Sequence, residues 1–179
     1  MHHIYLENDD LLICPVDQTA LLNYQRLTKD IFQLLSDHKT LQFLPEKRLF
    51  SLAEAEHWLG TTLMNMYCGR NQTHLILSKQ TERLLGIIDL IPPRVAQEYY
   101  QLPEYPYFLE FYLNKSACGQ LLMSNLLPQV VELLKARGIE QIAAVVNRKN
   151  LAACKVLSRS GFLNKCYFDC QQDMYLVSA

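Results

Sequence analysis

The sequence predicts a mixed α/β fold, in which a mostly antiparallel sheet carries helices on both faces. Short apolar runs that are typical of strands alternate with longer segments of helical periodicity. A strand–helix–strand unit is expected within residues 107–146, and it takes a right-handed crossover if its two strands are parallel neighbours. The length of 179 residues predicts a single domain over residues 1–179.

The first part of the chain is expected to form one strand and two helices. Leu11–Cys14 is an apolar run that ends at Pro15, as strands often do. Apolar residues recur at near-helical spacing over Asp17–Asp37, which predicts the first helix. The second helix begins with a capping box at Ser51–Glu54, in which the serine hydroxyl accepts from the Glu54 amide and the glutamate reaches back to the serine amide. Gly69 is expected to end this helix.

The middle of the chain changes to the pattern of strands. His74–Ser78 and Leu84–Ile91 are short and apolar, and the polar segment Lys79–Arg83 joins them, which predicts a β-hairpin. The proline- and tyrosine-rich segment Pro92–Pro106 is expected to be a loop. Tyr107–Leu113 is rich in aromatic residues and is therefore predicted to be a strand.

The last third of the chain is expected to hold two helices, each ended by a glycine, and three strands. Pro128 lies inside the first of these helices and cannot donate a backbone hydrogen bond, which predicts a kink. The expected elements are the helix Cys118–Arg137 before Gly138, the strand Gln141–Val146, the helix Asn150–Ser160 before Gly161, and the strands Phe162–Asp169 and Met174–Val177.

Composition and charge disfavour several classes of protein. The 17 Lys and Arg residues against 18 Asp and Glu residues give a net charge of −1, which does not support a nucleic-acid partner. No apolar stretch reaches the roughly 18 residues of a membrane span, and no signal peptide is expected. The six cysteines form no C-x-x-C pair and the histidines no i,i+4 pair, so we expect no metal site. These features favour a cytoplasmic protein with reduced thiols.

A candidate anion site lies where the strand Tyr107–Leu113 passes into the next helix. Amides at a helix N-terminus carry roughly half a positive charge, and Gly119 would let a ligand approach the backbone. The junction therefore suits a phosphate group, although most such junctions are only turns. Between Gln141 and Phe168 there are five basic residues and no acidic one, either as a solvated face or as the counter-charge of a phosphorylated cofactor. They are Arg148, Lys149, Lys155, Arg159 and Lys165.

The segment Val146–Phe162 resembles the N-x-x-S/A-x-x-V-L/Y-x-K/R-x-G-F motif of GNAT-superfamily N-acetyltransferases. The matching positions are Asn150, Ala153, Val156, Leu157, Arg159, Gly161 and Phe162. The order of elements over about residues 4–177 is similar to the branch of ribosomal-protein N-terminal acetyltransferases that includes RimJ and RimL. The resemblance implies a GNAT-like sheet with two central splayed parallel strands. It also implies acetyl transfer from acetyl-CoA to a primary amine, either a protein N-terminus or a small amine. A homodimer is compatible with it.

The same resemblance implies where acetyl-CoA binds. The pantetheine arm pairs with the backbone of the first central strand, and the pyrophosphate is held by amides of a Q/R-x-x-G-x-G/A loop. Here Ser116 replaces the Gln or Arg of that loop, and Leu121 replaces its second small residue. Asn150 is expected either to contact the pantetheine or to order the final helix. The implied cofactor-binding residues are Phe111, Tyr112, Leu113, Cys118, Gly119, Gln120, Leu121, Leu122, Asn150 and Lys155.

Amine acetylation needs a neutral amine, a polarised carbonyl and a proton for the departing thiolate. Glu110 lies in the strand that the resemblance assigns to the cofactor and is the candidate catalytic base; the alternative is a strand carboxylate paired with a surface lysine. No general acid is identified from the sequence, because Ala153 and Leu157 stand where family members often place a Tyr or Ser. The neighbouring Cys154 and Ser158, and Tyr112 or Tyr167, are the candidates considered. Four acidic residues would attract a cationic acceptor if they were free, although scattered surface carboxylates usually attract nothing specific. They are Asp37, Glu46, Asp169 and Asp173.

Three other functions are weighed against the acetyltransferase. A doubly wound nucleotide-binding domain is disfavoured because no G-x-G-x-x-G follows the first strand. A GNAT-like domain with a degenerate loop would bind acyl-CoA or a protein partner without turnover. A cysteine hydrolase would use Cys118 at the helix N-terminus as a nucleophile. The hydrolase is disfavoured because all five histidines lie at or before His74.

Overall fold

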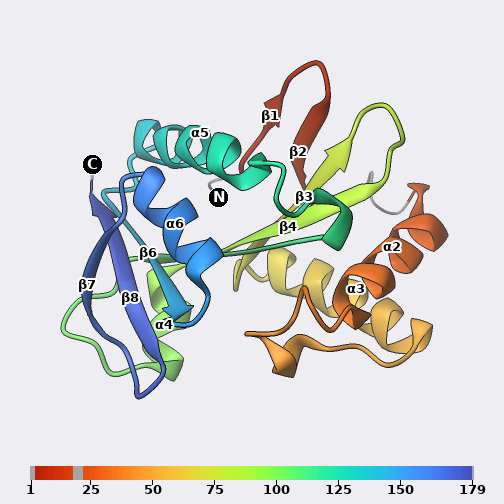
Figure 1. The fold of residues 1–179 in the computed structure, drawn as a ribbon. Coiled ribbons are helices and arrows are strands. Elements are labelled where there is room, and N and C mark those ends of the chain that lie inside the picture. Colours follow the sequence, from red (N-terminus) through yellow and green to blue (C-terminus); the bar gives the residue numbers. More distant parts are fainter. Residues whose placement is uncertain (1–2, 18–21, 179) are drawn as a thin grey trace. The chain divides into compact units, whose positions relative to one another are not determined.

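The computed structural model describes residues 3–17 and 22–178, and the chain divides into two compact units (Figure 1). The first unit contains His3–Asp89 and Phe111–Cys118, and the second contains Leu90–Glu110 and Gly119–Ala179. Each unit is described by itself. The single domain over residues 1–179 stays a prediction.

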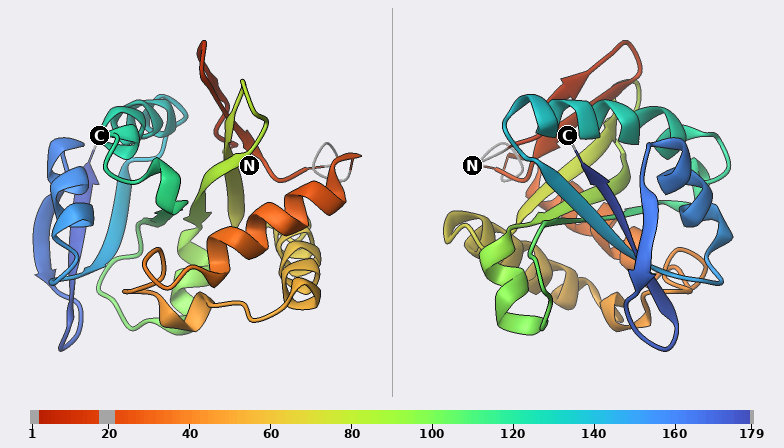
Figure 2. Two further views of the ribbon diagram at one scale, coloured as in Figure 1. Left: turned by 45° about the vertical axis from the view of Figure 1, so that its right-hand side comes forward. Right: turned by 90° about the vertical axis from the view of Figure 1, so that its left-hand side faces the viewer.

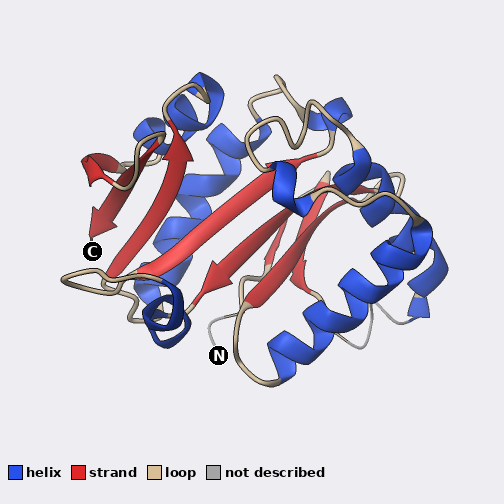
Figure 3. Ribbon diagram, turned by 90° about the horizontal axis from the view of Figure 1, so that it is seen from below, coloured by secondary structure: helices blue, strands red, loops and turns tan. Residues whose placement is uncertain are grey.

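The fold class is mixed α/β, as the sequence predicts (Figure 3). The described residues form eight strands that pair mostly antiparallel, with one parallel pair. Helices connect and cover these strands, so the strand pairs are neither a pure sandwich nor a purely parallel sheet.

The first unit contains four antiparallel strands and two long helices. Its strands follow one another in the order β1-β2-β3-β4. Its elements are β1 (Leu6–Glu7), β2 (Leu11–Pro15), α2 (Tyr24–Ser36), the short 3-10 helix η1 (Pro45–Lys47), α3 (Leu52–Tyr67), β3 (Gln72–Ser78) and most of β4 (Leu84–Ile91).

The core of this unit lies between α2, α3 and the strands. The buried residues Leu27, Ile31, Leu34 and Leu35 are spaced i, i+4, i+7 and i+8, so one stripe of α2 faces inward. The apolar residues of α3 and of the strands pack against this stripe and include Ala55, Leu59, Leu75 and Ile87. The helix predicted over Asp17–Asp37 is therefore confirmed from Tyr24 onward, whereas residues 18–21 lie outside the described part.

The capping box at the start of α3 is half as predicted. Ser51 Oγ accepts a hydrogen bond from the Glu54 amide at 3.2 Å, as expected. The glutamate, however, accepts from the amide of Phe50 at 2.8 Å, one residue before the serine. Both amides precede or open the helix and have no intrahelical partner, so the motif still satisfies two donors. Gly69 follows the cap of α3 with a left-handed φ of 64°, as predicted.

The second unit contains the parallel strand pair and three helices. Its strands follow one another in the order β5-β6-β8-β7. Its elements are α4 (Pro93–Tyr99), the first part of β5 (Tyr107–Leu113), α5 (Leu122–Ala136), β6 (Gln141–Asn147), α6 (Leu151–Arg159), β7 (Leu163–Tyr167) and β8 (Gln172–Ser178).

Helices cover both faces of these strands. Ala96 of α4 packs against Phe108 and Ala143, which lie on one face of the β5–β6 pair. The neighbouring residues Ile142 and Ala144 are also buried, and strand alternation turns them to the opposite face. Figure 2 shows α4 and α6 on opposite sides of β6, and α5 packs against α6.

Two sequence predictions in this unit are wrong. The segment Pro92–Pro106 is not entirely a loop, because α4 forms over Pro93–Tyr99. Proline at the first helical position has no amide to lose and already has a helical φ, so it begins this helix rather than breaking it. The helix predicted from Cys118 begins at Leu122 instead, because Gly119 and Leu121 both have left-handed φ values.

Candidate functional site

The parallel strand pair joins β5 to β6 over a short ladder. Tyr107 pairs with Ile142 and Phe108 with Ala143, and β6 then continues along β8 to Asn147. Glu110 lies two residues beyond Phe108 and is half-buried. Because side chains alternate along a strand, Glu110 lies on the same face as Phe108, the face covered by α4. The predicted catalytic carboxylate therefore lies just past the end of the parallel ladder.

The segment after β5 folds into a tight turn. Asn114 caps the 3-10 helix η2 (Lys115–Ala117), and its side-chain oxygen accepts from the Ser116 amide at 3.1 Å. The backbone amide of Ala117 donates to the Asn114 carbonyl at 2.9 Å. Cys118 then ends this turn, and its Sγ lies 3.4 Å from the Asn114 carbonyl oxygen.

Two left-handed residues open α5. Gly119 has a φ of 76°, and a Cβ added there would meet no atom within 4 Å. Leu121 has a φ of 58° and a ψ of 11°. A left-handed conformation costs a residue with a side chain roughly 1–2 kcal/mol, so the loop holds Leu121 in a conformation that favours glycine. Leu121 thus keeps the backbone conformation expected of the Gly or Ala that the family loop has at this position.

The N-terminus of α5 is not capped by a side chain. Leu121 is the N-cap residue and its side chain has no group that accepts a hydrogen bond, and the first turn contains no acidic residue. The amides of the first helical turn have no intrahelical partner, and the helix dipole makes this end positive. Leu121 is 58% exposed. This end of α5 has the properties of an anion-binding terminus.

The second half of β5 is held within the first unit. Tyr112 is buried in the core of that unit, and Lys47 Nζ lies 5.7 Å from the centre of its ring. The Leu113 carbonyl accepts from the Thr40 hydroxyl at 3.1 Å. A Cβ on Gly86 would lie 2.8 Å from the Tyr112 carbonyl oxygen, so β4 approaches β5 closely at this glycine. The Tyr112 side chain is thus committed to the core, and Tyr112 has only its backbone to offer a ligand.

Asn150 caps α6. Its side-chain oxygen accepts a hydrogen bond from the Ala153 amide at 3.2 Å, which is the helix-ordering role weighed from the sequence. Lys155 is exposed on the same helix. Gly161 follows the end of α6 with a φ of 85°, as predicted.

The acetyltransferase (GNAT) domain family matches residues 24–163 of the chain. The chain belongs to the GNAT acetyltransferase family. Members of this family transfer an acetyl group from acetyl-CoA, so this acetyltransferase is an enzyme with acetyl-CoA as its co-substrate.

Solved structures of other acetyltransferases have a similar fold over nearly the whole length of this chain. RimL, a ribosomal α-N-protein acetyltransferase in complex with coenzyme A, has a TM-score of 0.69 at 17% identity, covering 98% of this chain and 97% of RimL. The ribosomal-protein-S5-alanine acetyltransferase of Vibrio fischeri has a TM-score of 0.68 at 11% identity, covering 98% and 96%. The self-immunity acetyltransferase MccE in complex with acetyl-CoA and AMP has a TM-score of 0.70 at 11% identity, covering 96% and 94%. No curated protein matches the sequence.

Three of the four acidic residues considered for the acceptor are engaged inside the acetyltransferase. Asp173 accepts from Arg148 Nε at 2.7 Å and from the Asn164 amide group at 3.2 Å. Asp169 accepts from the backbone amides of two residues in its own turn at 2.7 Å. The backbone hydrogen bond from Thr40 lowers the pKa of Asp37. Only Glu46, exposed in η1, has no such bond among these four in the described residues.

Of the five basic residues between Gln141 and Phe168, one is engaged within the protein and four are exposed. Arg148 donates four hydrogen bonds to the turn between β7 and β8 and stacks on Tyr167, so it is not a phosphate ligand. The others are exposed, as a solvated face would be, and remain open to a ligand. They are Lys149, Lys155, Arg159 and Lys165.

The thiols of Cys118 and Cys14 do not fit a nucleophile. Burial raises the pKa of the Cys118 thiol, and the nearby Asp37 carboxylate raises it further. Burial also raises the pKa of Cys14 to about 11. A reactive cysteine needs the opposite shift, because the thiolate is the attacking species.

Tyr175 is a polar group that sequence reasoning missed. A hydrogen bond with Cys154 raises the pKa of Tyr175 to about 12, and burial adds to the effect. The register of β6 and β8 pairs Tyr175 with Ala144. The two tyrosines considered from the sequence lie elsewhere, since Tyr112 is buried in the first unit and Tyr167 is 81% exposed. No linear motif marks Tyr175, because its partner lies on another element.

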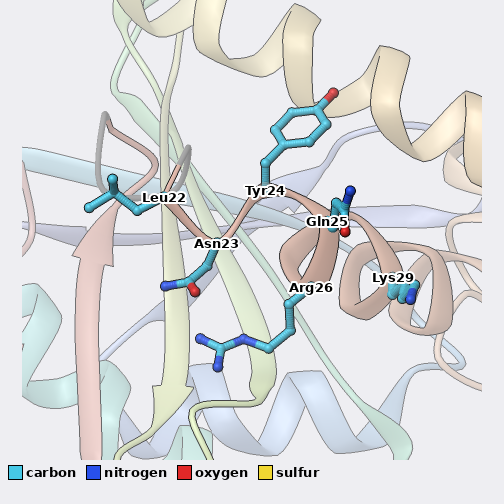
Figure 4. Close-up of a pocket in the computed structure, with 6 residues that line it drawn as sticks. All are labelled: Leu22, Asn23, Tyr24, Gln25, Arg26 and Lys29. Atoms are coloured by element: carbon cyan, nitrogen blue, oxygen red, sulfur yellow. The ribbon is translucent and has the colours of Figure 1, made fainter.

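Two hollows of the described residues lie away from these positions. The larger hollow has a volume of about 510 Å³ and lies at the start of α2 (Figure 4). The smaller one, about 140 Å³, lies between α2 and the strands beside the Arg26–Glu82 ion pair. None of the site residues predicted from the sequence lines either hollow.

Residues 3–17 and 22–178 contain no group of three His, Cys, Asp or Glu side chains that would hold a metal ion. In the same residues, every helix is too short or too polar to cross a membrane.

Proposed function

We propose that this acetyltransferase transfers the acetyl group of acetyl-CoA to a primary amine by direct attack of the amine on the thioester. The observation that carries the proposal is the opening of α5, where Gly119 and Leu121 are left-handed and no side chain caps the helix. Alternating backbone conformations of this kind turn successive amides toward one side, which suits an anion. The pyrophosphate of coenzyme A is such an anion.

The cofactor residues follow from this assignment. The amides of Cys118, Gly119, Gln120, Leu121 and Leu122 would hold the pyrophosphate. The backbone of Phe111, Tyr112 and Leu113 would pair with the pantetheine arm, which agrees with the burial of the Tyr112 side chain. Exposed Lys155 would pair with a phosphate through a charge-assisted hydrogen bond. Asn150 would act chiefly by ordering α6.

Glu110 is the proposed base of the reaction. An α-amino group has a pKa of about 8, so a fraction of it is already neutral near pH 7 and a weak base suffices. Glu110 would accept the proton that the amine nitrogen loses as it bonds to the carbonyl carbon. A backbone amide would stabilise the oxyanion. The carbon–sulfur bond then breaks, and the coenzyme thiolate takes a proton from solvent.

A protein N-terminus is the first acceptor class to test. RimL is named for acetylation of a protein α-amino group, and the Vibrio fischeri neighbour for a ribosomal protein. The six free cysteines support a reducing compartment, so we place the enzyme in the cytoplasm. A homodimer is compatible with the family resemblance, and light scattering after size exclusion measures the oligomeric state.

Calorimetry with acetyl-CoA and an assay of coenzyme A release test the proposal. The acceptor panel contains spermidine and short peptides that begin with Ser, Ala or Met. We expect micromolar binding of acetyl-CoA and release of coenzyme A with at least one peptide. Binding without turnover on the whole panel favours the degenerate domain instead. If acetyl-CoA does not bind, the assignment of this loop to the pyrophosphate is wrong.

A further inference from the structure

One peptide group at the end of β5 is held from both sides. The backbone amide of Asn114 donates to the carbonyl of Leu85 on β4 at 2.7 Å. The carbonyl of the same peptide group, which is that of Leu113, accepts from the Thr40 hydroxyl at 3.1 Å. This peptide group is planar and trans, so its N–H and its C=O point in opposite directions. The two hydrogen bonds therefore fix the orientation of the plane between Leu113 and Asn114.

The Leu113 carbonyl lies on the side of β5 that faces away from β4. The carbonyl of the preceding residue, Tyr112, faces β4, because a Cβ on Gly86 would lie 2.8 Å from its oxygen. In an antiparallel pair the hydrogen-bonding groups of successive residues point to alternate edges of the strand. The ladder with β6 ends at Phe108, so within the described residues Thr40 takes the place that a strand partner would have. The proposed function assigns this edge of β5 to the pantetheine arm.

The loop after α2 places Thr40 at this carbonyl. Asp37 follows α2, and its Oδ1 accepts from the Thr40 amide at 2.8 Å. The next residue, Leu41, is buried in the core of the first unit, and its amide donates to the Asp37 carbonyl at 3.2 Å. The hydroxyl therefore comes from a segment that is itself anchored, although it lies 73 residues from Leu113 along the chain.

The fixed peptide group lies between the two segments that are proposed to hold acetyl-CoA. The backbone of residues 111–113 precedes it, and the chain continues through η2 toward Gly119. A carbonyl oxygen has two lone pairs, so the Leu113 carbonyl can accept from Thr40 and also from a pantetheine amide. If the peptide plane rotated, this carbonyl would leave the edge of β5. Its orientation therefore decides whether the edge can pair with the pantetheine arm.

We infer that Thr40 is a positioning residue for acetyl-CoA: its hydroxyl fixes the Leu113–Asn114 peptide group, and with it the edge of β5 on which the pantetheine arm pairs. This inference rests on the proposed function. It adds a residue that acts on the coenzyme through the backbone of β5. The hydroxyl group is what acts, so serine should replace threonine at this position and valine should not.

Calorimetry with acetyl-CoA on Thr40→Val and Thr40→Ser tests the inference. Valine keeps the branched shape and lacks the hydroxyl, so the loss of one hydrogen bond should raise the Kd about fivefold. Serine keeps the hydroxyl, and its Kd should stay close to wild type. Thr28→Val is the matched control, because Thr28 is buried on α2 and its hydroxyl has no hydrogen-bond partner among the described residues. Its Kd should equal that of wild type.

Hydrogen exchange of the free enzyme, measured by NMR, gives a second readout that needs no ligand. The Asn114 amide should exchange faster in Thr40→Val than in wild type, because its peptide plane is then held from one side only. In Thr40→Ser the exchange rate should remain near that of wild type. Thr40→Ala takes the place of Thr40→Val in both measurements if the valine variant does not fold.

Three outcomes with a wild type that binds acetyl-CoA overturn the inference. The first is an unchanged Kd in a folded variant without the hydroxyl. The second is an equal rise of the Kd in Thr40→Ser, since the hydroxyl would then not be responsible. The third is a raised Kd with unchanged exchange at Asn114, because Thr40 would then contact the coenzyme directly. A wild type that does not bind acetyl-CoA removes the proposed function, and this inference falls with it.

Discussion

The side-chain oxygen of Asn150 accepts a hydrogen bond from the backbone amide of Ala153 at 3.2 Å, and this bond closes the first turn of α6. The asparagine of the family motif therefore has a structural role in this enzyme that needs no ligand. A capping side chain satisfies one of the amides that the helix cannot satisfy itself.

Replacing this cap is expected to cost stability before it costs binding. Asn150→Ala should lower the free energy of unfolding by about 1 kcal/mol, as loss of an N-cap does. Asn150→Asp should retain most of that stability, because aspartate caps helices equally well. Urea unfolding measures the difference. A large loss of acetyl-CoA affinity in Asn150→Asp with unchanged stability would show that Asn150 contacts the coenzyme directly.

Gly119 is the position where a negative charge should be least tolerated. Gly119→Glu places a carboxylate beside the proposed pyrophosphate and forces a side chain into a φ of 76°. We expect the Kd for acetyl-CoA to rise by at least roughly tenfold, from charge repulsion and strain together. Calorimetry measures this. Gly60→Glu is the matched control, since a Cβ there also meets nothing within 4 Å and the residue lies on α3. An unaltered Kd in Gly119→Glu would refute the assigned phosphate loop.

Leu121 should be improved by losing its side chain. Leu121→Gly removes the strain of a left-handed leucine and is expected to stabilise the fold by about 1 kcal/mol. Affinity for acetyl-CoA should not fall, because the proposed contacts come from backbone amides. Leu121→Val should be less stable than wild type, since a branched side chain resists this conformation most. Thermal unfolding ranks the three proteins, and a glycine variant less stable than wild type would contradict the assignment of strain.

The long elements of the fold were predictable because each has a clear local pattern. Tyr107–Leu113 and Leu84–Ile91 form strands with the predicted bounds. The wrong predictions lie where one residue type is compatible with two backbone conformations. Pro93 begins a helix where the sequence predicts a loop, and α5 begins only after Leu121 although leucine favours helices. Both outcomes depend on backbone angles that the residue type alone does not specify.

Gly86 should be required for the close approach of β4 to β5. An added Cβ would lie 2.6 Å from Leu113 Cδ2 and 2.8 Å from the Tyr112 carbonyl oxygen. The side chain of Leu113 could shift, whereas the backbone oxygen could move only with its strand. Gly86→Ala is therefore expected to destabilise the enzyme by about 1–3 kcal/mol. It should also weaken acetyl-CoA binding through the displaced backbone. Gly60→Ala is the control, and equal stability of the two variants would contradict the steric argument.

Tyr175 should make stability depend on alkaline pH. The folded state raises the pKa of Tyr175 to about 12 from its ordinary value of 10.0. Between these values the unfolded chain loses the proton while the folded chain keeps it, so stability falls as the pH rises through this window. Urea unfolding at about pH 9 and about pH 11 should show a steeper loss for wild type than for Tyr175→Phe. If both proteins lose the same free energy of unfolding between the two pH values, the Tyr175–Cys154 hydrogen bond is not the cause of the pH dependence.

Less of the candidate site than of the fold could be read from the sequence. The position of Glu110 past a parallel ladder follows from strand order and alternation, both of which are local patterns. The engagement of Asp173 does not, because its partner Arg148 lies 25 residues away along the chain. Tyr175 was missed because its partner Cys154 lies on another element, and pairing across elements leaves no spacing to recognise.

The torsion angles at Leu121 have a consequence for the ancestry of such loops. A chain can exchange a glycine for a bulky residue and still inherit the bend, provided that the surrounding segments hold it in place. Searches that require a small residue at this point would pass over such a descendant. Surveys of related enzymes should therefore compare the φ and ψ angles of this turn rather than the residue type at this position.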